Sequence, residues 1–328
     1  MEDRKTLIAK LEALCSARVI CYATSDRGGQ ETQIGDDAGP VFYQHLRAIG
    51  NVDRLALLLY SRGGQTMTGF AISNAMRELA KEVTVLVPFR AHSCATLIAL
   101  SGNKIVMGPF GQLSPIDPSI TSPHGPNLTQ GTETKFIPVS VEDVAGYFSL
   151  ARAEAKVAED RMNEVLAHLC TRVNPLALGA VYRAREQIGM LARKLLKKHL
   201  DDESKIERII NALTRQLLSH DYVIGRTEAK DIGLPIEDAT PDVADAMWGV
   251  YTTLAEEMKF AQPWNVEIEL GTQQSVKRTN MRAVIESLDL KHCFATSHEL
   301  KRTTLVKDGM KFDAVQGKII DEGWRESA

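Results

Sequence analysis

The chain has 328 residues, of which 44% are hydrophobic, so it can bury one large core or two modest ones. Its 39 Lys and Arg residues against 42 Asp and Glu residues leave a formal net charge of −3. No chain-wide basic field is therefore available to hold nucleic acid or an anionic membrane surface. Apolar runs also stay well short of the roughly 18 residues that a membrane span needs, so we expect a globular protein with neither kind of partner.

The cysteines and the first residues indicate the compartment. The five cysteines are scattered, and none forms a CxxC pair or lies near a His pair that would complete a zinc site. The N-terminus begins with charged residues and continues with a helical apolar pattern, unlike the basic start and apolar block of a signal peptide. The expectation is a cytoplasmic protein that uses no metal and no other cofactor.

Apolar runs of strand length alternate with helical patterns in the first third of the chain. Strands are expected at residues 18–23, 54–60, 83–87 and 104–107, and helices between them at residues 39–49, 66–80 and 94–100. The second and third runs, LALLLY and VTVLVP, are continuously apolar, which is typical of strands covered on both faces. This alternation predicts an α/β protein with a mainly parallel sheet, whose ligand binds at the carboxyl ends of the strands.

The remaining chain is more varied. Residues 108–138 are rich in Pro, Gly, Ser and Thr, too irregular for regular elements but long enough to shape a pocket wall. The pattern is then helical to about residue 260, with Asn174 and Thr240 as expected N-caps, and a strand is expected at residues 266–270. The predicted organisation is one domain at 1–262, with a sheet core at 18–140 and a helical part at 141–262, and a C-terminal extension of unknown role at 263–328.

Two motifs follow successive strands. SRGGQ, with Gly63 and Gly64, comes after LALLLY, and AHSCAT, with Ser93, comes after VTVLVP and runs into an apolar helix. Acyl transfer needs a hydroxyl exposed at a sharp strand-to-helix turn and backbone N–H groups aimed at the developing oxyanion. Both motifs also fit a plain interpretation, since a double glycine is an ordinary turn and a serine is an ordinary helix N-cap.

The segments LLLYSRGGQ, VLVPFRAHSCATLIALSGNKIVMGPFGQLSPIDP and SHDYVIGRTEAKDIGLP resemble the serine dehydrogenase proteinase family. That family is similar to signal peptide peptidase A and to the proteolytic subunit of Clp protease. The resemblance implies a ClpP/crotonase-like ββα superhelical fold, here with an added helical segment and a small C-terminal extension. It also implies a serine peptidase that acts on a peptide or protein substrate and assembles into a homo-oligomer.

The resemblance assigns site residues one by one. Ser93 corresponds to the nucleophile, and Gly63 and Gly64 correspond to the oxyanion loop. Cys94 corresponds to the second backbone donor. The family pattern reads AHSAGT and LGPIDP, whereas this chain has Ala95 and Ser114 in place of glycine. If either position requires positive φ or open space for the substrate, these replacements impair the site.

The general base has two main candidates. Lys135 lies 42 residues after Ser93, close to the spacing of Ser-Lys members of the class. Apolar neighbours would lower the pKa of its amine toward neutrality, as a lysine base requires, although a solvated surface lysine is the plain alternative. His124 is the rival, because an imidazole needs no large pKa shift to act as a base.

A Ser-His-Asp triad of the Clp type is not preserved. The position of the Clp-type histidine is occupied by Asp117, while Asp221, beside His220, falls where the Clp-type acid lies. His220 and Asp221 would therefore support a different triad or simply cap the helix that begins near Thr227. The base remains open among these arrangements.

Three functions follow from these residues. The first is a metal-free serine endopeptidase-like hydrolase that cleaves peptide bonds through a Ser93 acyl-enzyme, with Lys135 as base. The second is a catalytically impaired binding or assembly module, suggested by Ala95, Ser114 and the absent Clp-type histidine. The third is an acyl-coenzyme A hydrolase or hydratase, because crotonases share the fold and bind a thioester carbonyl with the same paired amides. A serine beside the second amide favours nucleophilic catalysis over this third function.

Overall fold

The structure is a computed structural model that describes residues 3–116, 119–120, 123–130, 133–137, 139–217, 219, 221–307 and 310–327. The chain folds as two compact units. The first contains residues 1–112, 225–227 and 235–328, and the second contains residues 113–224 and 228–234. This division differs from the predicted boundary at residue 262, because the C-terminal strands belong to the same sheet as the N-terminal strands.

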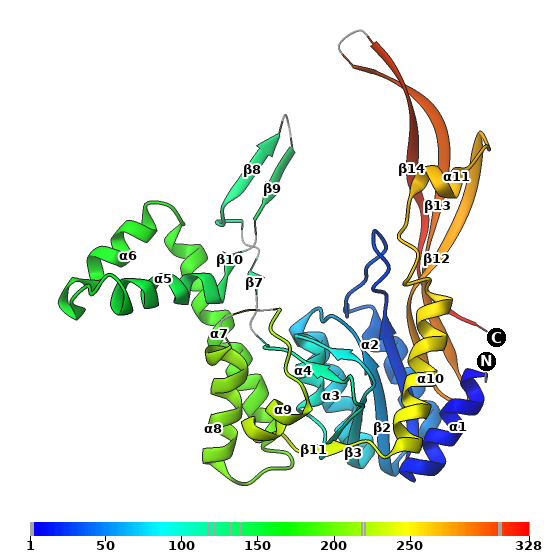
Figure 1. The fold of residues 1–328 in the computed structure, drawn as a ribbon, viewed down its shortest axis with the longest axis horizontal. Coiled ribbons are helices and arrows are strands. Elements are labelled where there is room, and N and C mark those ends of the chain that lie inside the picture. The colour runs from blue at the N-terminus through cyan, green and yellow to red at the C-terminus, as the bar shows by residue number, and fades with distance from the viewer. Residues whose placement is uncertain are drawn as a thin grey trace. The chain divides into compact units, whose positions relative to one another are not determined.

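The first unit is built on an eight-stranded sheet in the order β11-β5-β3-β2-β1-β12-β13-β14 (Figure 1). The strands are β1 (Arg18–Thr24), β2 (Val52–Tyr60), β3 (Ala80–Val87), β5 (Lys104–Met107), β11 (Ile236–Asp238), β12 (Ser275–Glu286), β13 (Lys291–Lys307) and β14 (Met310–Glu326). Neighbours from β11 to β1 pair in parallel, and the last three strands are antiparallel. The predicted α/β fold with a mainly parallel sheet is confirmed.

Helices cover both faces of the parallel strands. They are α1 (Arg4–Cys15) and α10 (Pro241–Glu257) on one face, and α2 (Ala38–Ile49), α3 (Thr66–Leu79) and α4 (Cys94–Ala99), which pack on one another, on the other. Leu11 and Met247 join Cys21 in one apolar cluster. Tyr22 points to the opposite face, where its ring meets the Phe42 ring at 6.3 Å between centroids. Coverage of both faces explains why the central strands are continuously apolar.

The chain after Pro263 extends this sheet. β12 pairs with β1 from Cys21 opposite Glu286 to Thr24 opposite Ala283, and β13 and β14 continue as the long ribbon coloured orange to red in Figure 1. The predicted strand at 266–270 is wrong, because Val266–Leu270 forms the short helix α11. Its N-cap, Asn265, accepts hydrogen bonds from the first turn, and Gly271 ends it at φ 57°.

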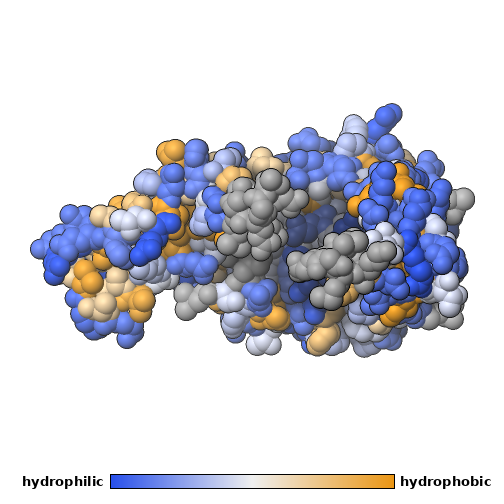
Figure 2. Space-filling view, turned by 90° about the horizontal axis from the view of Figure 1, so that it is seen from above, coloured by the Kyte–Doolittle hydropathy of each residue, from blue (hydrophilic) through white to orange (hydrophobic). Residues whose placement is uncertain are grey.

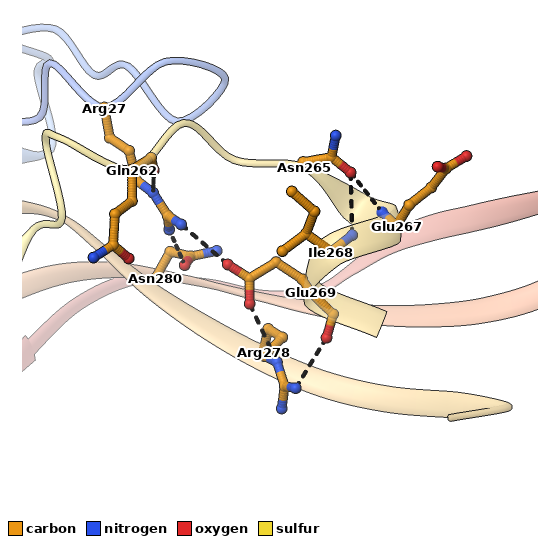
Figure 3. A network of polar contacts seen from close by, with 8 residues as sticks. All are labelled: Arg27, Gln262, Asn265, Glu267, Ile268, Glu269, Arg278 and Asn280. Carbon is orange, nitrogen blue, oxygen red and sulfur yellow. Dashed lines mark hydrogen bonds and ion pairs between the residues drawn. The ribbon is translucent and has the colours of Figure 1, made fainter. Parts of the chain in front are cut away.

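A buried arginine joins this extension to the loop after β1 (Figure 3). Arg27 donates from Nε to the Gln262 carbonyl oxygen (2.6 Å) and from Nη1 to Asn280 Oδ1 (2.7 Å). Its Nη2 atom lies 3.0 Å from Glu269 Oε1, and Glu269 also pairs with Arg278. One guanidinium group that is only 3% exposed therefore holds the loop after β1 to three points between residues 262 and 280.

Arg27→Ala is expected to lower the free energy of unfolding of the first unit by about 3 kcal/mol, because it leaves a largely buried carboxylate without one of its two cations. Arg27→Lys keeps the charge but loses the planar fork, so we expect an intermediate loss. Trp248, Trp264 and Trp324 all lie in the first unit, so tryptophan fluorescence during urea denaturation reports its unfolding. A loss below 1 kcal/mol for the alanine variant would show that the network contributes little.

A second buried contact joins α2 to the turn between β12 and β13. His45 Nδ1 lies 2.9 Å from Ser287 Oγ, and His45 Nε2 lies 3.0 Å from His292 Nδ1. Burial, together with the neighbouring His292, lowers the pKa of His45 from 6.5 to about 4. The folded protein therefore favours the neutral imidazole at this position.

The pH dependence follows from that shift. Between pH 6.5 and about 4 the unfolded chain binds the His45 proton and the folded chain does not, so stability falls as the pH is lowered through this window. The loss from His45 is about 3 kcal/mol and levels off below the folded pKa. His45→Gln keeps hydrogen-bonding groups but cannot titrate, so its unfolding free energy should fall less steeply in urea titrations from pH 7 to 4. Equal slopes for the two proteins would contradict this assignment.

The second unit is mainly helical. Its elements are α5 (Val141–Ala153), η1 (Glu159–Arg161), α6 (Met162–Cys170), α7 (Pro175–Leu196), α8 (Glu203–Asn211) and the π-turn η2 (Ala212–Gln216), and α9 (Arg226–Ile232) begins in the first unit and ends here. Asn174 caps α7 by accepting from Leu176 N (2.9 Å), as predicted. In the other unit, Thr240 is confirmed as the N-cap of α10, with Pro241 in the first turn.

Short strands interrupt the irregular segment that was expected at 108–138. They are β6 (Gln112–Leu113), β7 (Ser119–Ile120), β8 (Asn127–Gln130) and β9 (Glu133–Phe136), followed by β10 (Val139–Ser140). β8 and β9 pair as an antiparallel hairpin, with Leu128 opposite Lys135.

Figure 2 shows hydrophobic residues among hydrophilic ones over α5 to α7, at the left of the view. None of the helices in the described part of the chain combines the length and apolarity needed to cross a bilayer.

Candidate active site

Ser93 lies at a sharp turn between the end of β3 and the start of α4. The two-residue strand β4 (Arg90–Ala91) leads into it, and α4 begins at the next residue. Its backbone angles are φ 52° and ψ −117°, a conformation that a non-glycine residue rarely adopts. The Ser93 side chain makes no capping bond to α4, so the plain N-cap interpretation does not describe it. The serine is half-buried at this turn.

Gly63 and Gly64 follow β2 and lie beside this turn. Gly63 has φ 115°, and a methyl group there would lie 2.8 Å from Ser93 Cβ and 3.2 Å from Ser93 Oγ. Gly64 has φ 151°, and a methyl group there would lie 2.3 Å from the carbonyl oxygen of Ile34. Both positions therefore require glycine, one for the serine and one for the loop that follows β1.

Two backbone N–H groups are open at this place. Ile34 N donates to Gly63 O (2.9 Å) and Gln65 N donates to Ile34 O (2.8 Å), so the Gly64 N–H faces away from Ile34. Gly63 N is occupied, since it donates to Ser61 Oγ at 3.1 Å. Within the described residues, no acceptor is paired with the N–H of Gly64 or of Cys94. Gly63 thus leaves space for the Ser93 side chain, while Gly64 and Cys94 offer N–H donors.

Residues that sequence reasoning missed hold the two loops in place. Ser61 N donates to Arg90 O and His92 N donates to Ser61 O, both at 3.0 Å, which ties the segment before Gly63 to the segment before Ser93. The buried Thr24 hydroxyl donates to Ser61 Oγ (2.8 Å). Ser61 lies two residues before the double glycine, but Thr24, Arg90 and His92 are 29 or more residues away from it, so only the fold reveals this role.

A carboxylate two residues after the end of β1 supports the same edge of the sheet. Asp26 Oδ2 accepts from Tyr60 Oη (2.7 Å) and from Arg90 Nη1 (2.6 Å), and Asp26 Oδ1 lies 3.4 Å from Arg62 Nε. Arg90 and Arg62 are the residues three before Ser93 and one before Gly63. Asp26 therefore binds side chains on the N-terminal side of both motifs.

The two departures from the family pattern cause no backbone strain. Ala95 is the second residue of α4, and neither Ala95 nor Ser114 has positive φ. Ala95 is fully buried, and Ser114 Oγ donates to the Pro115 carbonyl oxygen at 2.9 Å. A glycine is not required at either position for its conformation.

The candidate bases all belong to the second unit. Lys135 lies in β9, but its side chain is outside the described residues, as are Asp117 and His220. His124 and Asp221 are exposed in turns. The structure thus brings together Ser93, Gly63, Gly64 and Cys94 in the first unit, and the contact between Ser93 and a base stays a prediction.

Among the described residues, no set of three or more His, Cys, Asp or Glu side chains is placed to hold a metal ion. All five cysteines are described, and each carries a free thiol.

The chain has a ClpP-like α/β fold, in which parallel strands are covered by helices. Residues 36–171 match the family described as ClpP-like SDH-type serine proteinase. The resemblance inferred from the sequence is thereby confirmed over a segment that contains both motifs. The family is one of serine peptidases.

Individual relatives were also compared. Two uncharacterized proteins of Methanocaldococcus jannaschii are similar to this chain. One is 26% identical over 63% of this chain and 61% of its own length, and the other is 23% identical over 56% and 52%. The chain thus spans less than two thirds of either relative. A ClpP1 mutant from Listeria monocytogenes aligns with 71% of this chain and 98% of its own, at 15% identity and a TM-score of 0.36.

Proposed function

We propose that this protein is a serine endopeptidase-like hydrolase that cleaves peptide bonds through an acyl-enzyme on Ser93. The observation that carries the proposal is the strained turn at Ser93, which stands beside a glycine loop with an open N–H group. Strain of this kind costs about 1–3 kcal/mol and persists where the surrounding structure imposes it, often at active sites.

Each residue then has a role in the reaction. Ser93 Oγ attacks the carbonyl carbon of the scissile peptide, and its proton passes to the base. The negative charge that develops on the carbonyl oxygen is stabilised by the N–H groups of Gly64 and Cys94. The base returns the proton to the leaving amine, and water then hydrolyses the acyl-enzyme.

We propose Lys135 as the base, a role that rests on its spacing from Ser93 and on its apolar neighbours in the sequence. The alternatives are His124 and an arrangement of His220 with Asp221. None of these residues needs a metal or cofactor to act on a serine.

We also propose that the protein works as a homo-oligomer, as the family resemblance implies. Exposed apolar side chains on the helices of the second unit support this, because such residues on neighbouring helices often mark contact surfaces. They are Leu150, Leu166, Leu176, Tyr182 and Met190.

The non-catalytic alternative is weakened by one finding. It was suggested partly by Ala95 and Ser114, and both have ordinary backbone conformations. Acyl-coenzyme A chemistry has no observation in its favour beyond the open N–H groups, which a peptidase uses equally.

The rate of labelling by a fluorophosphonate probe tests the nucleophile and its base together. We expect the wild type to be labelled and Lys135→Ala to be labelled at least about 100-fold more slowly, since a positioned base contributes on the order of 10²–10⁴. Lys81→Ala is the matched control, because Lys81 is exposed and pairs with Asp53. If His124→Ala loses labelling instead, His124 is the base. An unlabelled wild type would favour a binding module.

A further inference from the structure

The thiol of Cys94 contacts the loop that carries the other open N–H group. Cys94 Sγ donates to the carbonyl oxygen of Gln65 at 3.1 Å, and Gln65 directly follows Gly64. The same carbonyl oxygen accepts from Gly69 N (3.1 Å), the bond that closes the first turn of α3. The side chain of one donor residue is therefore bonded to the backbone next to the other.

A close approach of α3 and α4 makes this contact possible. A methyl group on Gly69 would lie 2.5 Å from Cys94 Sγ and 3.2 Å from Ile98 Cγ1. Only glycine at this position leaves room for the sulfur atom, which occupies the space where the two helices meet. Gly69 is buried, so a methyl group added there could not avoid the sulfur atom by turning toward solvent.

The thiol is a proton donor over the whole physiological range. Burial raises the pKa of Cys94 to about 12, although a hydrogen bond with the Gly69 backbone lowers it slightly. A protonated thiol that is 2% exposed is not a nucleophile, because cysteine reacts as the thiolate. Its place in the structure therefore points to a mechanical role.

We infer that the Cys94 side chain is a positioning group that sets the separation between the Gly64 and Cys94 N–H groups. The inference rests on the proposed function and deepens it, since it names the group that keeps the two N–H donors at the separation needed to bind the oxyanion. Removing the thiol takes away one bond between the loop after β2 and α4, and small displacements of the two donors lower the rate of acyl transfer sharply.

The fluorophosphonate labelling rate tests the inference, because the same N–H groups bind the phosphoryl oxygen as Ser93 displaces fluoride. We expect Cys94→Ala to be labelled about tenfold more slowly than wild type. Cys94→Ser should stay within about threefold, since a hydroxyl still donates to Gln65 O. Gly69→Ala, which pushes the sulfur away from the opposite side, should resemble Cys94→Ala.

Cys21→Ala is the matched control, because Cys21 is fully buried in the core of the same unit and lies away from the two motifs. It should lose thermal stability without losing labelling rate. Equal rates for wild type and Cys94→Ala, or equal slowing in Cys94→Ala and Cys94→Ser, would overturn the positioning role while leaving the hydrolase intact. An unlabelled wild type would instead overturn the proposed function and this inference with it.

Discussion

Ser93→Ala is expected to reduce peptide hydrolysis by about 10³-fold or more, because no other group in the site can form the acyl-enzyme. The measurement is the release of acid-soluble peptides from an unfolded protein such as casein. The variant should keep the melting temperature of the wild type within about 2 °C, since the change removes one oxygen atom from a half-buried side chain.

Ser101→Ala controls for the loss of a hydroxyl near the other end of α4. Ser101 Oγ donates to the Ile98 carbonyl oxygen at 2.7 Å, so this variant removes a buried hydrogen bond and should cost stability rather than activity. Residual casein hydrolysis in Ser93→Ala at more than a tenth of the wild-type rate would rule out Ser93 as the nucleophile.

Gly63→Ala is expected to inactivate the site by geometry. The new methyl group would lie 2.8 Å from Ser93 Cβ and 3.1 Å from the His92 carbonyl oxygen, at a φ of 115° that alanine rarely adopts. Backbone strain of this kind costs about 1–3 kcal/mol. We therefore expect both a lower midpoint of urea unfolding and a fall of at least about 100-fold in casein hydrolysis, because the Gly64 donor moves with the loop.

The matched control is Gly39→Ala, which makes the same chemical change in the same unit. Gly39 lies in α2 with nothing within 4 Å of the added methyl group. A helical glycine replaced by alanine gains roughly 0.5–1 kcal/mol, so this variant should be slightly more stable and fully active. Wild-type activity in Gly63→Ala would show that the glycine loop lies too far from the reacting atoms to matter.

Local chemistry explains which parts of the fold could be predicted. Asn174 and Thr240 were recognisable as caps because each is followed by proline, and the first strands were recognisable because burial on both faces leaves a continuous apolar run. Residues 266–270 were predicted as a strand from their isoleucine and valine. The Asn265 side chain, which bonds two N–H groups of the first turn, instead starts a helix there.

Long-range pairing explains what could not be predicted. β14 is largely exposed and β13 is largely half-buried, so their side chains carry no strong alternation, and their place in the sheet depends on β12 finding β1 more than 250 residues earlier. The site shows the same limit. The motifs identify Ser93 and Gly63, but the bonds from Thr24 to Ser61 and from Cys94 to Gln65 join segments that only the folded chain brings together.

The central claim is a nucleophilic Ser93, and locating a covalent adduct tests it most directly. Trypsin cleaves after Arg90 and Lys104, so one peptide carries both Ser93 and Ser101. After reaction of the wild type with a fluorophosphonate, tandem mass spectrometry of this peptide should place the phosphonyl group on Ser93. A protein that stays unmodified, or an adduct on Ser101 or on a hydroxyl of another peptide, would contradict the account.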